Sequence, residues 1–249
     1  MRPTVCFTID HEPDCPPWLT ATHRGVEEAT APLLAMLAEL GVPATWFSTG
    51  DVAERYPDAM RAIVAGGHEL GCHGHTHRRF DAIDAADADW ELATASAALR
   101  RHAPVTSFRA PNLVFPDAYL PLLERHGYAL DSSQARYKAA YRRARRHPAP
   151  TALARIPASV TSSVLRLPRA VRETWIDAAA RASAAPLVLF VHPWEFVDLR
   201  HTRIRLDCRF HTGPEAWRRV RATLEHLAAR GARFVTMRDA AAELAPRTA

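Results

Sequence analysis

Short apolar runs alternate with amphipathic stretches along the whole chain of 249 residues. Thr4–Ile9 and Leu187–His192 are apolar runs typical of buried strands. Glu27–Leu40 instead carries its leucines at helical spacing and is followed by Gly41, where a helix would end. Strands that alternate with helices predict a parallel sheet whose strands are joined by right-handed crossovers.

The same alternation continues to the C-terminal end. Further strands are predicted over Ala44–Phe47, Glu69–Cys72, Ser107–Arg109, Tyr128–Asp131 and Arg233–Thr236. Further helices are predicted over Pro57–Ala65, Ala85–Arg101, Asp117–His126 and Pro214–Arg230. About seven such units predict an α/β fold of the irregular (β/α)7 barrel type, in a single domain over residues 1–249. The segment 136–170, rich in proline and arginine, breaks the alternation and is expected to be a basic insertion or lid.

Charge and targeting signals narrow the function classes. The net charge is +5, and much of the excess lies in the run Arg136–Arg146. This run could contact a membrane surface or a phosphorylated substrate, or it could be a solvated helix face. No DNA or RNA recognition motif accompanies it, so we expect no nucleic-acid partner. The chain has no apolar stretch of roughly 20 residues and no signal-peptide pattern, which predicts a cytoplasmic protein.

Polar side chains follow the predicted strands at the points where these strands end. They are Asp10, Glu12, His73, His77, Arg109, Asp131 and His192. In parallel barrels the C-terminal ends of the strands form the rim at which catalytic residues are assembled. We therefore expect the functional site at this rim.

Two acidic residues flank a histidine in Asp10-His11-Glu12. Successive side chains of a strand point to opposite faces, so Asp10 and Glu12 would share a face and His11 would point away. One carboxylate could then hold a cation while the other takes up a proton. A local turn in an acidic loop is the alternative interpretation.

Three histidines lie within five residues in His73-Gly-His75-Thr-His77. Residues four apart share a face if the backbone turns helically, and neutral imidazole is a common zinc ligand. Two histidines and one carboxylate form a known catalytic zinc set. His75 could exchange roles with either neighbour.

His192 ends an apolar strand, where a titratable group could give a proton to a leaving nitrogen. Arg109 could bind a carboxylate through two parallel hydrogen bonds. The alternative for His192 is a core histidine bonded to backbone. The alternative for Arg109 is an ordinary strand-end salt bridge.

These motifs, in this order, resemble the polysaccharide deacetylase family, also called the NodB homology domain or carbohydrate esterase family 4. The similar segments are Thr8–Glu12 for the first motif, His73–His77 for the second, Phe108–Pro111 for the third and Leu189–His192 for the fifth. The resemblance extends from Thr8 to about Thr236 and implies the family's barrel. It also implies a hydrolase with one divalent metal ion, Zn²⁺ being expected and Fe²⁺, Co²⁺ or Ni²⁺ being alternatives.

The resemblance implies a role for each residue. Asp10 would be the catalytic base, Arg109 would hold Asp10, and His192 would be the general acid. The implied metal ligands are Glu12, His73 and His77.

The first and fourth motifs depart from the family pattern. The common first motif has adjacent aspartates, whereas here His11 intervenes, so His11 or His75 could replace a proposed ligand. The usual fourth motif has a tryptophan four residues after its aspartate. Asp131 lacks this tryptophan, which implies a substrate groove unlike that of chitin-type enzymes.

The segments His-Pro-Trp-Glu-Phe and Arg209–Gly213 resemble the branch of intracellular and sugar-precursor deacetylases. The expected substrate is therefore a small or carrier-linked N-acylated sugar, from which an N-acetyl group would be removed. Alternatives are a deformylase, a cyclic-amide hydrolase of the same fold, or a non-catalytic carbohydrate-binding module. The sequence leaves the oligomeric state open.

Overall fold

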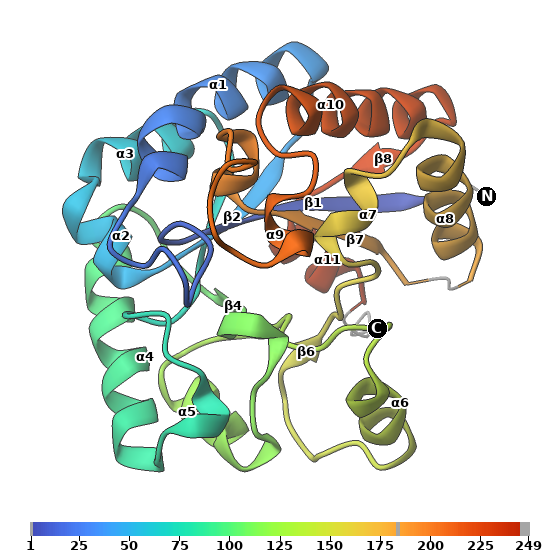
Figure 1. Cartoon of the computed structure of the whole chain (residues 1–249). Coiled ribbons are helices and arrows are strands. Elements are labelled where there is room, and N and C mark those ends of the chain that lie inside the picture. Colours follow the sequence, from blue (N-terminus) through green and yellow to red (C-terminus); the bar gives the residue numbers. More distant parts are fainter. Residues whose placement is uncertain (1, 183–184, 245–249) are drawn as a thin grey trace.

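Parallel strands form one curled sheet in the order β6-β5-β4-β3-β2-β1-β7, with β8 pairing beside β1 (Figure 1). The computed structural model describes residues 2–182 and 185–244. The strands are β1 (Thr4–His11), β2 (Ala44–Ser48), β3 (Glu69–Cys72), β4 (Ser107–Phe108), β5 (Leu130–Asp131), β6 (Ala154–Arg155), β7 (Leu187–Val191) and β8 (Arg233–Phe234). This architecture confirms the predicted irregular α/β barrel of the (β/α)7 type.

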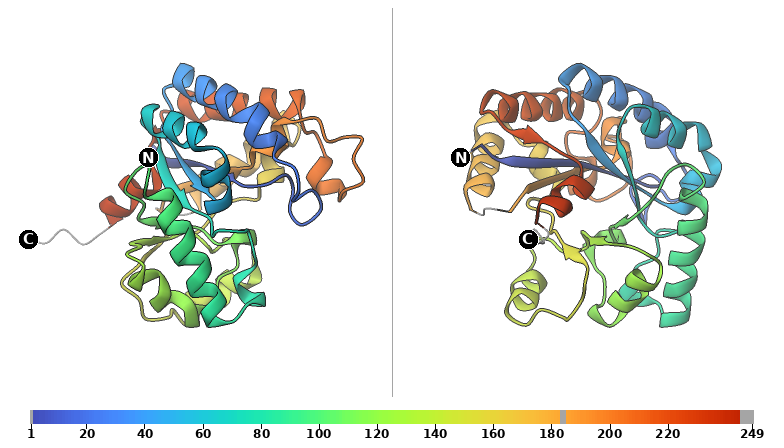
Figure 2. Two further views of the ribbon diagram at one scale, coloured as in Figure 1. Left: turned by 90° about the vertical axis from the view of Figure 1, so that its left-hand side faces the viewer. Right: turned by 180° about the vertical axis from the view of Figure 1, so that it is seen from behind.

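Helices surround the sheet on its outer side (Figures 1 and 2). The α-helices are α1 (Arg24–Leu40), α2 (Gly50–Arg55), α3 (Pro57–Ala65), α4 (Ala85–Leu99), α5 (Leu120–Arg125), α6 (Ala139–Arg146), α7 (Ser162–Leu165), α8 (Arg169–Arg181), α9 (Leu206–Arg209), α10 (Pro214–Ala229) and α11 (Met237–Leu244). Short 3₁₀ turns are η1 (Phe80–Ala82), η2 (Pro111–Leu113), η3 (Asp117–Tyr119) and η4 (Pro193–Phe196). Among the described residues, no helix is both long and apolar enough to cross a bilayer.

The side chains of β1 alternate between two cores. Val5, Phe7 and Ile9 belong to the main core between the sheet and the outer helices, whereas Cys6 belongs to a small cluster inside the barrel. That inner cluster comprises Cys6, Phe47, Leu130, Ile156, Val188, Val235, Met237 and Ala240. α11, which contacts β1 and β5, closes this end of the barrel. The alternation leaves the interior above the cluster to polar residues that face the C-terminal rim.

The sheet does not close through a ladder between β6 and β7 in the part of the chain that is described. Ser159 bridges the opening through two hydrogen bonds. The backbone N–H of Ser159 donates to the Val188 carbonyl, and its hydroxyl accepts from the Val188 N–H, both at 2.9 Å. The barrel is therefore incomplete but nearly closed.

The segment 136–170, expected to be a basic insertion or lid, contains α6, β6 and α7. β6 pairs in parallel with β5, so part of this segment belongs to the sheet. The sequence analysis did not predict β6, because its two residues lie within a proline- and arginine-rich segment without an apolar run. A lid function for α6 stays a prediction.

Candidate active site

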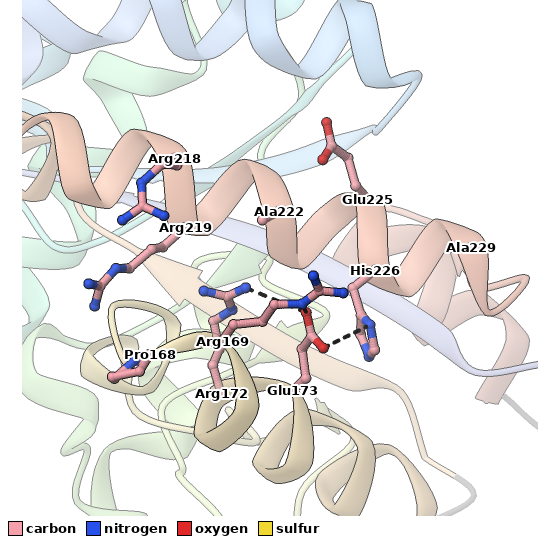
Figure 3. A pocket seen from close by; sticks show the side chains of 10 residues that line it. All are labelled: Pro168, Arg169, Arg172, Glu173, Arg218, Arg219, Ala222, Glu225, His226 and Ala229. Carbon is pink, nitrogen blue, oxygen red and sulfur yellow. Dashed lines mark hydrogen bonds and ion pairs between the residues drawn. The ribbon is translucent and has the colours of Figure 1, made fainter.

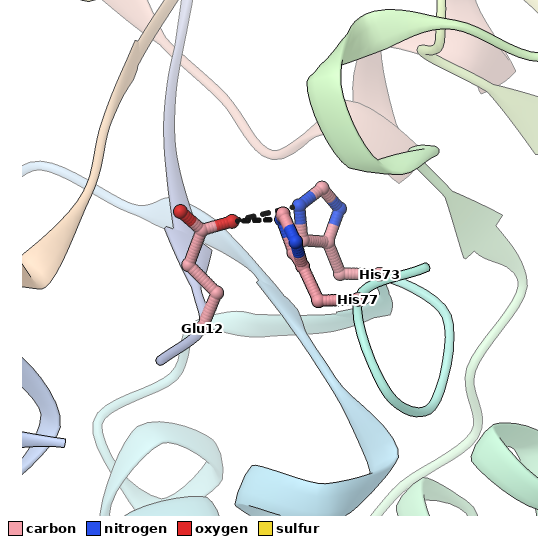
Figure 4. Close-up of side chains that lie close together, drawn as sticks. All are labelled: Glu12, His73 and His77. Carbon is pink, nitrogen blue, oxygen red and sulfur yellow. Dashed lines mark hydrogen bonds and ion pairs between the residues drawn. The ribbon is translucent and has the colours of Figure 1, made fainter. Parts of the chain in front are cut away.

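Three side chains converge at the rim where β1 and β3 end (Figure 4). Glu12 follows β1, and its Oε2 lies 3.1 Å from His73 Nε2 and 2.7 Å from His77 Nε2. One donor atom from each residue lies within 4.8 Å of the other two. The other carboxylate oxygen of Glu12 accepts a hydrogen bond from Trp194 Nε1 at 3.1 Å, which leaves Oε2 for the histidines. The positive charges of His77 and His192 outweigh burial and hold the pKa of Glu12 well below its usual range.

The hydrogen bonds of His73 test whether this cluster fits a cation. His73 Nδ1 lies 2.7 Å from the carbonyl oxygen of Arg109, which can only accept, so Nδ1 is the donor. In a neutral imidazole, Nε2 then presents a lone pair to the Glu12 carboxylate. Two acceptors face each other unless a cation lies between them. A carbonyl-bound Nδ1–H is also the usual outer partner of a metal-bound histidine, so the residues fit a divalent metal.

The loop after β3 brings His77 back to Glu12 without a helical turn. The expected helical backbone is therefore wrong: the loop residues form no helix, and Gly74 and His77 have φ values of 76° and 62°. A residue with a Cβ rarely adopts such a φ, which accounts for glycine at position 74. Glu91 of α4, fully buried, accepts from the backbone N–H groups of His75 and Thr76 at 2.6 and 2.9 Å. Glu91 thus fixes the loop that carries two candidate ligands.

The two alternative ligands point elsewhere. His11 lies between β1 and α1, where Nδ1 is 3.2 Å from Ser48 Oγ and Nε2 is 3.0 Å from Thr30 Oγ1. His75 packs edge-on against Trp90, and it does not belong to the three-residue donor cluster. Of the candidates considered, only Glu12, His73 and His77 converge.

Asp10 faces the interior beside Glu12, and Arg109 lies beneath it. Arg109 Nη1 donates to Asp10 Oδ1 at 2.7 Å and to the hydroxyl of Thr8 at 2.7 Å. Its guanidinium is fully buried, and its carbon lies 4.3 Å from the centre of the Phe47 ring. The contact with Asp10 uses one nitrogen, so the expected two-pronged hydrogen bond is wrong. The second carboxylate oxygen, Oδ2, stays available at the cavity.

His192 stands across the cavity, directly after β7. Its Nε2 lies 3.9 Å from Asp10 Oδ2, and its Nδ1 lies 2.6 Å from Glu195 Oε1. Glu195 in turn lies 2.8 Å from Arg166 Nε, with both side chains buried. Burial lowers the pKa of His192, but the charges of Glu12, Glu195 and Asp10 more than offset it and raise the pKa to about 9.

The sequence analysis missed four side chains that support the site: Glu91, Arg166, Trp194 and Glu195. Glu195 could have been found, because it stands three residues after His192 at the start of a 3₁₀ turn. The other three reach the site only through tertiary packing, which the sequence analysis did not predict. Asp131, in contrast, binds Arg155 Nε at 3.0 Å and lies outside the cavity lining.

The cavity at this rim has a volume of about 850 Å³. Asp10, Glu12, His73, His77 and His192 all contribute to its lining. Its entrance carries the exposed aromatic rings of Trp18 and Tyr137 and the cationic side chains of Arg78, Lys138 and Arg205. Two of these cations are paired, Arg78 with Asp87 at 2.6 Å and Arg205 with Asp207 at 2.7 Å.

Comparison with known families bears on this arrangement. The model of the polysaccharide deacetylase family matches residues 2–130, just over half of the chain. The chain belongs to the polysaccharide deacetylase family. Five of the six candidate site residues fall within this match: Asp10, Glu12, His73, His77 and Arg109. The sixth, His192, lies beyond it.

Two curated relatives align with the N-terminal part of the chain. The peptidoglycan deacetylase of Helicobacter pylori is 34% identical over 104 residues, which are 41% of this chain and 35% of that protein. The chitooligosaccharide deacetylase of Sinorhizobium fredii is 35% identical over 103 residues, 40% of this chain and 48% of that protein. The aligned region therefore spans less than half of either relative.

Solved structures share the fold over nearly the whole chain. A Mycobacterium smegmatis protein assigned to the polysaccharide deacetylases superposes with a TM-score of 0.70 at 21% identity, covering 98% of this chain and 91% of that one. A family 4 carbohydrate esterase from Streptomyces lividans gives 0.61 at 16% identity, covering 93% and 91%. A family 4 pseudoenzyme from Bacillus anthracis gives 0.64 at 14% identity, covering 96% and 66%. Because this fold includes a pseudoenzyme, activity has to be argued from the site.

Proposed function

We propose that this protein is a metal-dependent carbohydrate deacetylase that removes an N-acyl group, in particular N-acetyl, from an amino sugar in a small or carrier-linked molecule. One observation carries the proposal. A Glu-His-His donor set, an arginine-bound aspartate and a carboxylate-bound histidine face one cavity from the ends of β1, β3 and β7. Amide hydrolysis needs a cation, a base and an acid in this kind of proximity.

Glu12, His73 and His77 would hold one divalent metal, and zinc suits two imidazoles and a carboxylate. When bound, such a metal polarises the substrate carbonyl and lowers the pKa of a water molecule. Trp194 and the carbonyl of Arg109 orient two of the three ligands through the hydrogen bonds described above. These outer contacts would keep the donor atoms directed at one point.

Asp10 would act as the base. Arg109 holds one of its oxygens, so the other faces the cavity with a defined orientation. This oxygen would take the proton of the water that attacks the amide carbonyl. Arg109 would thereby orient Asp10 toward the attacking water.

His192 would be the general acid. Its Nδ1–H is bound by Glu195, so a proton on Nε2 points into the cavity toward the reaction centre. This proton would be given to the leaving nitrogen as the carbon–nitrogen bond breaks, releasing a carboxylate and a free amine. Glu195 and Arg166 would fix the ring and balance its charge.

The substrate class is proposed from the cavity and from the relatives. The curated relatives are named for deacetylation of peptidoglycan and chitooligosaccharides, which contain N-acetylated sugars. Trp18 and Tyr137 offer flat faces for a sugar ring, and Lys138 could bind a phosphate or other anionic group. α6 begins one residue after Lys138 and carries four exposed arginines, none with an ion-pair partner among the described side chains. This helix could contact a phosphorylated carrier or a membrane surface that presents it.

Metal content is the first test. Protein purified without added metal should contain about one metal ion per chain, and His73→Ala should lose it. His75→Ala is the matched control, because this loop residue lies outside the donor cluster. The wild type and the control should release amine from N-acetylglucosamine oligomers or from a nucleotide-linked N-acetylhexosamine, whereas His73→Ala should not.

The alternatives give different results. A wild-type protein that binds no metal after reconstitution with zinc or cobalt would refute the proposal and favour a carbohydrate-binding module. Release of formate rather than acetate would identify a deformylase. If deacetylation persists at full rate in His73→Ala, the assigned ligand set is wrong.

A further inference from the structure

A second cavity lies between α8 and α10, on the outside of the barrel (Figure 3). Its volume is about 680 Å³, and none of the described residues that line it also lines the cavity of the candidate active site. Four arginines contribute to it: Arg169 and Arg172 from α8, and Arg218 and Arg219 from α10. The proposed deacetylase chemistry gives this cavity no role.

Arg172 is a buried cation without a full counterion. It is 2% exposed, and Nε has no hydrogen-bond partner. Nη1 lies 3.4 Å from the carbonyl of Leu167, and Nη2 lies 3.7 Å from Glu173 Oε1. That same oxygen is bound by Arg169 at 2.9 Å. A buried guanidinium left with such weak contacts destabilises the fold relative to a paired one.

The acidic residues at the cavity do not supply the missing charge. Glu225 pairs with Arg221 at 3.1 Å, and in Figure 3 its carboxylate points away from α8. Glu173 is shared between Arg169 and His226, whose Nδ1 lies 3.7 Å away. Glu215, outside the lining, pairs with Arg218 at 2.6 Å and with Arg219 at 2.8 Å. Among the described arginines of the lining, Arg172 is therefore the one without a carboxylate oxygen within 3 Å.

The neighbouring arginines also affect the pKa of Arg172. Burial lowers the pKa of Arg172, and although Glu173 raises it, the positive charges of Arg219, Arg169 and Arg218 lower it further. An anion bound beside Arg172 would offset this repulsion. Planar guanidinium groups bind phosphate oxygens through paired hydrogen bonds, with a preference over simple halides that comes from geometry.

We propose that the cavity between α8 and α10 binds the phosphate group of a small phosphorylated molecule, with Arg172 as its central contact. Arg169 and Arg218, which are largely exposed, can move onto the remaining phosphate oxygens. The cavity is larger than a phosphate ion needs, so an attached sugar or nucleoside fits the same space. This site is independent of the proposed deacetylase activity, and its test does not use that activity.

Calorimetric titration with sodium phosphate and with a hexose 6-phosphate, against sodium chloride at equal ionic strength, tests the proposal. The titrations are repeated in His73→Ala, so that phosphate bound at the candidate metal centre is not counted. Wild-type protein and His73→Ala should bind phosphate equally. Arg172→Met should weaken binding by roughly tenfold or more, because it removes a charge-assisted bond at similar volume. Arg221→Gln, on α10 but outside the lining, should bind as the wild type does.

A second variant keeps the test decisive if Arg172→Met fails to fold. The double variant Arg169→Gln/Arg218→Gln changes two exposed residues and should weaken phosphate binding several-fold. Tighter binding of the hexose phosphate than of free phosphate would assign the cavity to a phosphorylated metabolite, and equal binding would assign it to the free ion. Absence of binding of either probe to the wild type, or unchanged binding in a folded Arg172→Met and in the double variant, overturns the proposal.

Discussion

Glu91 offers the most direct test of how the candidate metal centre is built. This carboxylate projects from α4 and accepts two backbone N–H groups from the loop that carries His73 and His77. It also binds the hydroxyl of Thr76. Since Glu91 does not itself belong to the donor cluster, Glu91→Gln changes the support of the loop without removing a ligand.

The structure sets the expected size of the effect. Both backbone N–H groups donate to the same oxygen, Oε2, so a glutamine that keeps its oxygen there retains both bonds. It replaces a charged acceptor by a neutral one, which weakens the two bonds by about 1–3 kcal/mol in total. Without metal, the free energy of unfolding should fall by that amount. Displacement of His77 should also weaken metal binding by about 10- to 100-fold, as is typical for outer contacts of a metal site. At equal excess metal the variant should then lose roughly a further 1.4–2.7 kcal/mol of metal-dependent stabilisation.

Urea unfolding with and without zinc, together with competition against a chelator, separates the two effects. Asp89→Asn is the matched control, because this residue is on the same helix but forms only surface ion pairs. The control should match the wild type in metal affinity. If Glu91→Gln binds zinc as tightly as the wild type and unfolds at the same urea concentration, the loop does not depend on Glu91 and the reasoning is refuted.

Three other side chains give separate predictions. Trp194→Phe removes the donor to Glu12 but keeps an aromatic ring beside His192, so metal affinity measured by chelator competition should fall several-fold; unchanged affinity contradicts this. Glu195→Gln removes the charge that orients His192, so kcat should fall with little change in KM, and the pH profile of kcat should shift; an equal loss in KM would indicate a role in binding instead. His68 Nδ1 accepts a hydrogen bond from a backbone N–H, and burial lowers the pKa of His68. As pH falls, the unfolded chain therefore takes up the proton first, and the free energy of unfolding decreases below about pH 6.5. In His68→Asn the loss of unfolding free energy between pH 7.5 and 5.5 should be smaller by at most about 1.4 kcal/mol, and an identical loss in both proteins contradicts this.

Strand periodicity predicted the most about the site. The alternation in β1 predicted that Asp10 and Glu12 share a face, and the order of the strands predicted that residues far apart in sequence meet at one rim. Both are properties of repeating backbone geometry, which single residues disturb little. The strands Ala44–Ser48 and Glu69–Cys72 were found for the same reason, since their apolar runs are bounded by polar residues.

Irregular backbone was predicted poorly. The path from His73 to His77 depends on two positive φ values and on an acceptor, Glu91, that lies fourteen residues after His77. No periodic pattern records such a contact, because it exists only when α4 packs against the loop. Strand β6 escaped prediction in a similar way, since pairing with β5 rather than its own two residues makes it a strand.

The structure explains why a histidine, His11, stands between Asp10 and Glu12. β1 stays extended through His11. If acidic residues stood at both positions 10 and 11, one side chain would point toward the cavity and the other toward α1. His11 fills that outer position without charge. The hydroxyl of Thr30 donates to the Val26 carbonyl and therefore accepts from His11 Nε2, while burial and the nearby His23 lower the pKa of His11 to about 3. A neutral histidine thus packs against the helix layer while Glu12, one residue further, returns to the interior beside Asp10. With His11 between them, Asp10 and Glu12 both reach the cavity, which leaves a carboxylate for each of the two proposed roles.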